Sequence, residues 1–97
     1  MVFVAEDERN ERLGFVSVGP STHFTGEPQA YIGELVVSET EEGRGVGKAL
    51  LQACEQWAQE QRYRFISLAT GAANERALGF YRHLGYLDED VKLVKPL

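Results

Sequence analysis

The sequence predicts an α/β domain whose mixed, mostly antiparallel sheet is built in the order β-β-β-α-β-α-β. Short β-branched runs are separated by charged or glycine-rich connections, and two longer segments repeat apolar residues every three or four positions. A glycine-rich turn joins the two patterns, and a right-handed crossover there would place the first helix on one face of the sheet. At 97 residues the chain is expected to form one domain, residues 1–97.

The N-terminal half predicts a meander of three strands. Residues 2–5 and 13–18 are short apolar runs on either side of the charged stretch EDERNER, which indicates a hairpin. Residues 19–29, GPSTHFTGEPQ, form the longest predicted loop. Residues 30–37 are apolar except for Glu34, which predicts a central strand that is covered on both faces.

The C-terminal half predicts two helices with strands after each. The first helix runs from Gly45 to about Gln61, with an apolar face and an outward polar face. The apolar face contains Val46, Leu50, Leu51, Cys54, Trp57 and Ala58, and the polar face contains Gln52, Glu55, Gln56 and Gln59. Residues 64–70 predict a strand, and residues 75–84 predict a helix with Asn74 as N-cap and Gly85 past its end. Residues 86–94 predict a last strand at the sheet edge.

Composition argues against several classes of function, among them nucleic-acid binding and zinc binding. The net charge is −5, and ten basic residues are scattered among fifteen acidic ones, which argues against a nucleic-acid surface. Cys54 is the single cysteine, which excludes a disulfide framework and favours a reducing compartment. His23 and His83 do not have the spacing of a zinc site. The N-terminal apolar run is too short for a signal peptide or a membrane span, so we expect a cytoplasmic protein that acts at no membrane.

The stretch EEGRGVGKALL, residues 41–51, concentrates glycine at the start of the first helix. Free N–H groups at a helix N-terminus attract anions, and Gly43 and Gly45 would let a phosphate approach the backbone. Arg44 and Lys48 add positive charge, although Lys48 could equally be a solvated helix residue and the whole stretch a simple turn. A Walker A loop is excluded because Ala49 stands where a hydroxyl is required.

The dinucleotide fingerprint G-x-G-x-x-G is excluded as well, because it would need glycine at Lys48 or at Leu50. The window from Glu42 to Gly47 instead resembles the coenzyme A pyrophosphate turn of the GCN5-related N-acetyltransferases (GNAT family). That signature has Gln or Arg, two residues, Gly, one residue, and then Gly or Ala. Gly45 and Gly47 match it, and Glu42 departs from it.

A second segment, residues 74–86, strengthens the resemblance. Its sequence NERALGFYRHLGY looks like the family pattern N-x-x-A-x-x-F-Y-x-x-x-G-F/Y. The resemblance runs from Val2 to the C-terminus and implies a truncated GNAT fold that lacks the usual first strand and two helices. Those elements form one wall of the acceptor pocket in the family. A homodimer partner, residues 19–29 or an open groove would replace that wall, or the chain is a fragment; we expect a homodimer.

The resemblance implies acetyl-CoA as cosubstrate. Its pantetheine arm would bond to the backbone of three residues, Leu35, Val36 and Val37, of which the two valines could also be ordinary core. Its pyrophosphate would lie against Gly43, Arg44, Gly45, Val46, Gly47 and Lys48. Asn74 would contact the cofactor with its side-chain amide, or act only as a helix cap, and the two roles are compatible.

The same resemblance implies an N-acetyltransferase that moves acetyl to a primary amine of a small molecule or peptide by direct attack. Tyr81 would be the general acid that protonates the coenzyme A thiolate, although its helical face also suits core packing. Glu34 is the candidate general base because it interrupts an apolar strand. Strict alternation puts Glu34 opposite Leu35, and a β-bulge would change that parity. His23 and bulk water are alternative bases.

Two other classes of function stay open from the sequence. The chain could be a non-catalytic acyl-CoA-binding module or pseudoenzyme, which the departure at Glu42 favours. It could also be an isolated interaction domain. Binding of acetyl-CoA and turnover of an amine distinguish the three.

Overall fold

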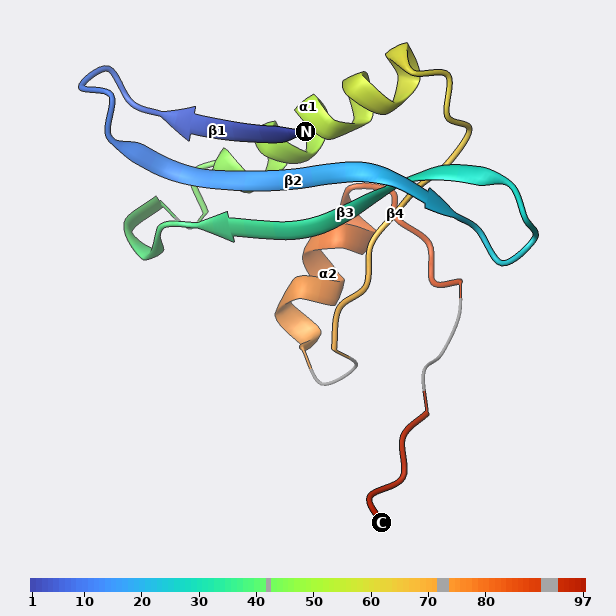
Figure 1. The fold of residues 1–97 in the computed structure, drawn as a ribbon. Helices are drawn as coiled ribbons and strands as arrows, with labels where there is room; N and C mark the ends of the chain where they lie inside the picture. Colours follow the sequence, from blue (N-terminus) through green and yellow to red (C-terminus); the bar gives the residue numbers. More distant parts are fainter. Residues whose placement is uncertain (42, 72–73, 90–92) are drawn as a thin grey trace.

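The computed structural model describes residues 1–41, 43–71, 74–89 and 93–97. The elements in order are β1 (Val2–Glu6), β2 (Arg12–Thr22), β3 (Pro28–Val37), the 3-10 turn η1 (Glu39–Glu41), α1 (Val46–Glu60), β4 (Ile66–Ser67) and α2 (Glu75–His83). The sheet has the order β1-β2-β3-β4, antiparallel except for the parallel β3–β4 pair (Figure 1). The predicted α/β class is confirmed, as are both helices and Asn74 as the N-cap of α2.

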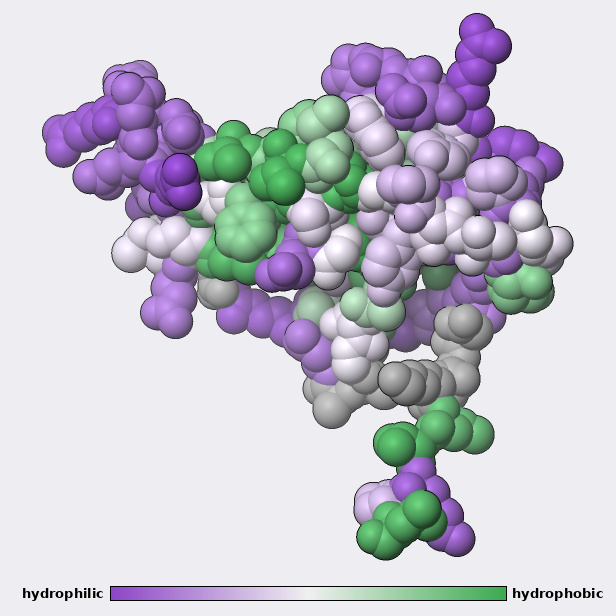
Figure 2. Space-filling view, in the orientation of Figure 1, coloured by the Kyte–Doolittle hydropathy of each residue, from purple (hydrophilic) through white to green (hydrophobic). Residues whose placement is uncertain are grey.

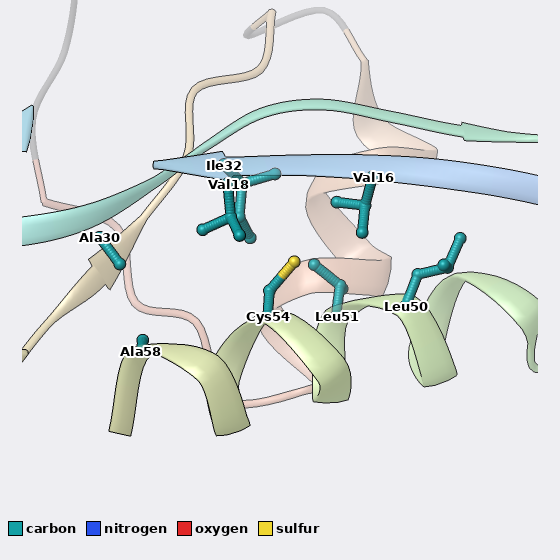
Figure 3. Close-up of a cluster of buried hydrophobic side chains, with 8 residues drawn as sticks. All are labelled: Val16, Val18, Ala30, Ile32, Leu50, Leu51, Cys54 and Ala58. Carbon is teal, nitrogen blue, oxygen red and sulfur yellow. The ribbon is translucent and has the colours of Figure 1, made fainter. Parts of the chain in front are cut away.

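The hydrophobic core lies between one face of the sheet and α1 (Figure 3). On β2, Val16 and Val18 point to this face because side chains alternate along a strand. On α1 the buried residues follow the helical repeat: Leu50, Leu51, Cys54 and Ala58. Each fully buried Val or Leu side chain contributes about 1.5–3 kcal/mol through the hydrophobic effect, so this interface carries much of the stability.

The second helix packs beside α1, on the same side of the sheet. Tyr81 and Leu84 contact the core cluster, and the ring of Phe80 lies against the first turn of α1 at Gly47. No helix among the described residues covers the opposite side of the sheet. No described helix is long and apolar enough to cross a membrane.

The uncovered face of the sheet is partly apolar. Val4, Phe15 and Val36 lie in register across β1, β2 and β3. Figure 2 shows apolar side chains gathered on this part of the surface, where they line a shallow cavity of about 340 Å³. The prediction that β3 is covered on both faces is therefore wrong for the described residues, because Val36 is 46% exposed and Tyr31 is 37% exposed.

The predicted loop over residues 19–29 is confirmed only for residues 23–27, because β2 and β3 continue as a hairpin to the pair Thr22–Pro28. Pro20 is tolerated in β2 because it pairs with Ala30, whose N–H points the other way and donates to the Phe65 carbonyl. In such a pair the nitrogen of Pro20 faces outward, beyond the end of β1, so no ladder hydrogen bond is lost.

A β-bulge interrupts the β2–β3 pairing. Ser17 is opposite Glu34, whereas the next residue, Val18, is opposite Ile32, so Gly33 is an extra residue on β3. The Ser17 hydroxyl accepts a hydrogen bond from the Glu34 N–H at 2.9 Å, and a Cβ on Gly33 would come within 2.9 Å of the same oxygen. Because the period of a strand is two, this one residue reverses the facing of everything after it.

The last two predicted strands differ from the structure. The strand predicted at residues 64–70 is reduced to β4, which pairs with β3 only at Ala30 and Tyr31 and then diverges. In the strand predicted at residues 86–94, the described parts 86–89 and 93–94 are not in a strand, and residues 90–92 lie outside the described residues. A two-residue β4 offers too short an edge for pairing, and Leu93 is accordingly 89% exposed.

Two glycines of β2 provide a matched test of this sheet. A Cβ at Gly14 would come within 2.5 Å of the Val36 carbonyl oxygen, whereas a Cβ at Gly19 would meet nothing within 4 Å. We expect Gly14→Ala to lower the free energy of unfolding by about 1–3 kcal/mol, as overpacking does, because backbone must move. We expect Gly19→Ala to change it by about 0.5 kcal/mol or less. Urea unfolding of both variants measures this, and equal effects would contradict the register.

Candidate functional site

The glycine-rich turn before α1 has a backbone that L-residues adopt only with strain. Gly43 has φ 80° and Gly45 has φ 82°, and a Cβ on either would meet nothing within 4 Å. Gly45 is the N-cap of α1 and makes no side-chain capping bond. No side chain at Gly43 or Gly45 would therefore keep an anion away from the free N–H groups of the first turn of α1, as an anion site requires. Glu42, the departure from the family signature, lies outside the described residues.

Gly47 has a different reason to be glycine. A Cβ there would come within 3.3 Å of Phe80 Cζ, so this position lets α2 pack closely on α1. Val46 is half-buried against the core and can offer only its backbone outward. Arg44 and Lys48 are exposed, one before and one after the start of α1, so both add positive charge close in sequence to the turn.

The edge of β3 that leads to this turn has no neighbouring strand among the described residues beyond Tyr31. The Ser38 N–H donates to Leu13 and the Val36 carbonyl lies against Gly14, so the backbone groups of Val36 point toward β2. By alternation, the N–H and C=O groups of Leu35 and Val37 point to the free edge. An extended ligand could add there as a strand does, and Val36 would not take part.

Asn74 begins α2 as its N-cap. Its Oδ1 accepts a hydrogen bond from the Ala77 N–H at 3.2 Å, so the capping role is confirmed. The residue is exposed, and its amide nitrogen is not used in that bond. A contact of Asn74 with a cofactor therefore stays a prediction that is compatible with the cap.

Tyr81 is half-buried on α2, against the core cluster. Its ring lies edge-on to Phe80 at 5.3 Å and to Tyr86 at 5.9 Å between centroids. Burial raises the pKa of the Tyr81 phenol above its usual value, so the group keeps its proton at neutral pH. Both sequence interpretations of this residue, core packing and proton donor, are compatible with this environment.

Glu34 is exposed on the uncovered face of the sheet, because the bulge puts Leu35 and Val37 on the core side and Glu34 opposite them. The bulge thus precedes Glu34, and the expectation of a buried carboxylate is wrong. Glu34 therefore lies on the uncovered face of the sheet, whereas Tyr81 packs against the core on the helical side.

His23 has both ring nitrogens engaged. Its Nδ1 lies 2.8 Å from the Thr25 hydroxyl and its Nε2 lies 2.7 Å from the Glu89 carboxylate, and the ring stacks on Phe65. These contacts fasten the β2–β3 hairpin to the segment after α2. His23 is therefore a poor candidate for a free general base. The described residues contain no group of three or more side chains that could hold a metal ion.

The sequence did not reveal a contact between the two helices. Tyr86 donates a hydrogen bond from its hydroxyl to the Glu55 carboxylate at 2.8 Å. Glu55 is half-buried, so its assignment to the outward face of α1 is wrong. Burial, followed by that hydrogen bond, raises the pKa of Tyr86 far above its usual value. No local pattern marks Glu55 as the partner of Tyr86, although the predicted helix end at Gly85 places Tyr86 just after α2.

Comparisons with known proteins agree with this geometry. Residues 1–86 match the family described as the acetyltransferase (GNAT) family. The chain is 31% identical over 85 residues to an L-methionine sulfoximine/L-methionine sulfone acetyltransferase of Pseudomonas aeruginosa, covering 88% of this chain and 49% of that protein. It thus spans about half the length of that relative.

Solved structures show the same arrangement. A putative acetyl transferase from Pyrococcus furiosus superposes with a TM-score of 0.92 at 33% identity, over 99% of this chain and 64% of that one. The NatC complex bound to Gag peptide and CoA matches with a TM-score of 0.82 at 26% identity, over 92% of this chain and 58% of that one. The class that the fold defines is that of the GNAT acetyltransferases. The chain belongs to the GNAT family.

The single cysteine tests the electrostatics of α1. Cys54 is fully buried, and burial, followed by the charge of Glu55, raises the pKa of its thiol from 9.0 to about 11. A rise of this size lowers the thiolate fraction at pH 8 by about 100-fold, and alkylation requires the thiolate. We expect iodoacetamide to label the folded chain at least about 100-fold more slowly than the chain in guanidinium. Similar rates in the two states would show that Cys54 is accessible and unshifted.

Proposed function

We propose that this chain is an N-acetyltransferase that transfers acetyl from acetyl-CoA to a primary amine of a small molecule or peptide by direct attack. One observation carries the proposal. The free edge of β3 at Leu35 and Val37 is followed, after the 3-10 turn η1, by the glycine turn whose N–H groups open α1. Coenzyme A has an extended arm that could pair with such an edge, followed by a pyrophosphate that could bind such N–H groups.

In this proposal the backbone of Leu35 and Val37 binds the pantetheine arm. The residues from Gly43 to Lys48 hold the pyrophosphate, with N–H groups at the turn and with the charges of Arg44 and Lys48 nearby. Asn74 contributes its free amide at the start of α2. Bound acetyl-CoA would supply an activated thioester, which these residues would hold beside the free edge of β3.

In this proposal the base and the acid lie on opposite sides of the sheet, Glu34 on the uncovered face and Tyr81 on the helical side. The acceptor ammonium approaches from the uncovered face and loses a proton to Glu34, directly or through water. The amine nitrogen then attacks the thioester carbonyl, a C–N bond forms, and the C–S bond breaks as the tetrahedral adduct collapses. Tyr81, on the helical side, gives its proton to the departing thiolate, and the second amine proton passes to solvent. Neither a metal nor a covalent enzyme intermediate is needed.

A second candidate function is an acyl-CoA-binding module without turnover. The uncovered sheet face supports it, because an acceptor pocket needs a second wall and the described residues provide only one. We propose that the wall is supplied by a second copy of the chain in a cytoplasmic homodimer. A module without turnover would leave the open face unused for catalysis.

Binding and turnover separate these functions. We expect acetyl-CoA to bind in calorimetry, and an amine panel that includes amino-acid, aminoglycoside and peptide amines to release free thiol. Tyr81→Phe should lower kcat by about 100-fold, because proton donation is worth about that much, while binding of acetyl-CoA changes little. Tyr63→Phe is the matched control, since it removes a hydroxyl from another half-buried tyrosine.

Each outcome decides between the functions. Absence of acetyl-CoA binding would rule out both the enzyme and the binding module and would leave an interaction domain. Binding without turnover on any amine would favour the module. Turnover by Tyr81→Phe at the wild-type rate would show that Tyr81 is not the acid.

The base has a test of its own. We expect Glu34→Gln to lower kcat by about 100-fold without changing the dissociation constant of acetyl-CoA, because the carboxylate faces the acceptor side only. Glu8→Gln, in the exposed turn between β1 and β2, is the control for loss of one negative charge. If Glu34→Gln retains full activity, bulk water is the base.

A further inference from the structure

The hydrogen bond from Tyr86 to Glu55 links the end of α2 to α1, and both side chains are half-buried. The donor lies just after α2 and the acceptor lies on α1, 31 residues apart in sequence, with a distance of 2.8 Å. The bond is stronger than a neutral one because the acceptor is a carboxylate. A phenylalanine at position 86, which would equally suit the family pattern, could not make it.

The end of α2 connects this bond to Tyr81. The Tyr86 N–H donates to the Tyr81 carbonyl at 3.1 Å, and the Gly85 N–H donates to the Arg82 carbonyl at 3.0 Å. These two bonds and the φ of 96° at Gly85 define a Schellman motif. In that motif the residue after glycine folds back over the one five positions earlier. The ring of Tyr86 therefore contacts the ring of Tyr81.

Two contacts thus hold α2 against α1, one on each side of Tyr81 along the chain. Phe80 packs on Gly47 at the start of α1, and Tyr86 bonds to Glu55 about 12 Å further along that helix, at 1.5 Å per residue. The contact of Phe80 with Gly47 fixes the spacing of the two helices near the glycine turn. The bond of Tyr86 to Glu55 fixes the Tyr86 ring, which lies against the Tyr81 ring.

We propose that Tyr86 and Glu55 form a positioning pair that holds the Tyr81 phenol in place for proton transfer. This inference rests on the proposed function, in which Tyr81 is the acid. The pair does not touch the reacting atoms. It acts through the ring of Tyr86, which is oriented at one end by the Schellman motif and at the other by the Glu55 carboxylate.

A purely structural tie between the helices makes a different prediction. It would lower stability when broken but would leave kcat of the folded enzyme unchanged. Tyr86→Phe keeps the ring and its contact with Tyr81, and removes only the hydroxyl. Glu55→Gln keeps an oxygen that can accept the bond, whereas Glu55→Ala removes it. These variants separate positioning from packing.

The experiment measures kcat, the KM for acetyl-CoA and the melting temperature of the full chain for each variant. We expect Tyr86→Phe and Glu55→Ala each to lower kcat by about tenfold, the value of one lost hydrogen bond, with KM within about twofold. The double variant should be no slower than either single one, because both break the same bond. Glu55→Gln should recover most of the loss, and Tyr63→Phe is the hydroxyl-loss control.

A second readout does not need turnover. In protein labelled with ¹³C at the tyrosine Cζ, the Tyr81 signal is identified by its loss in Tyr81→Phe. We expect Tyr86→Phe and Glu55→Ala to shift or broaden that signal, Glu55→Gln to move it back toward the wild-type position, and Tyr63→Phe to leave it unchanged. If the wild type turns over no amine, the proposed function fails and this signal alone decides whether the pair positions Tyr81.

Three results would overturn the inference. The first is a kcat of Tyr86→Phe equal to wild type, with a lower melting temperature alone. The second is additivity of the Tyr86→Phe and Glu55→Ala losses in the double variant. The third is a Tyr81 signal that neither of these substitutions moves.

Discussion

One extra residue in β3, Gly33, determines which side chains of this strand face the core and which face the uncovered side of the sheet. Gly33 has no side chain because a Cβ would crowd the Ser17 hydroxyl, and that hydroxyl accepts the N–H of the next residue. Before the bulge, Ile32 faces the core; after it, Leu35 does. The same reversal points Glu34 to the uncovered face and directs the backbone of Leu35 to the free edge. Without it, Glu34 would face α1 and Leu35 would face the uncovered side.

The helices and their ends could be predicted from local sequence because local rules decide them. Apolar spacing located α1, and Asn74 and Gly85 bracket α2 as a cap and a left-handed stop. The sheet could not be predicted in the same way. Pro20 fits within β2 only because of where β1 ends, and β4 pairs with β3 only at Ala30 and Tyr31, before the bulge at Gly33. Such features depend on pairing between distant segments, which one sequence does not display.

Some residues of the candidate site could likewise be predicted from local sequence, and others depend on distant contacts. The glycine turn is a local feature, and its positive φ angles follow from residue type. The reason for Gly47, by contrast, lies 33 residues away in the ring of Phe80, and the partner of Glu55 lies 31 residues away. From the sequence alone, Gly47 therefore looks like a motif position and Glu55 like an ordinary polar position. The facing of Glu34 and of Tyr81, on opposite sides of the sheet, is likewise set by the fold and not by local sequence.

The Schellman motif after α2 also sets the smallest portion of this chain that could be transferred to another protein. Because Tyr86 closes the helix and reaches α1, a fragment that stopped at His83 would contain every helical residue and still lose the closure. The match to the family ends at residue 86, the position where these contacts end. A graft of this unit into a new scaffold should therefore keep the two residues that follow the cap, Gly85 and Tyr86, as part of the helix.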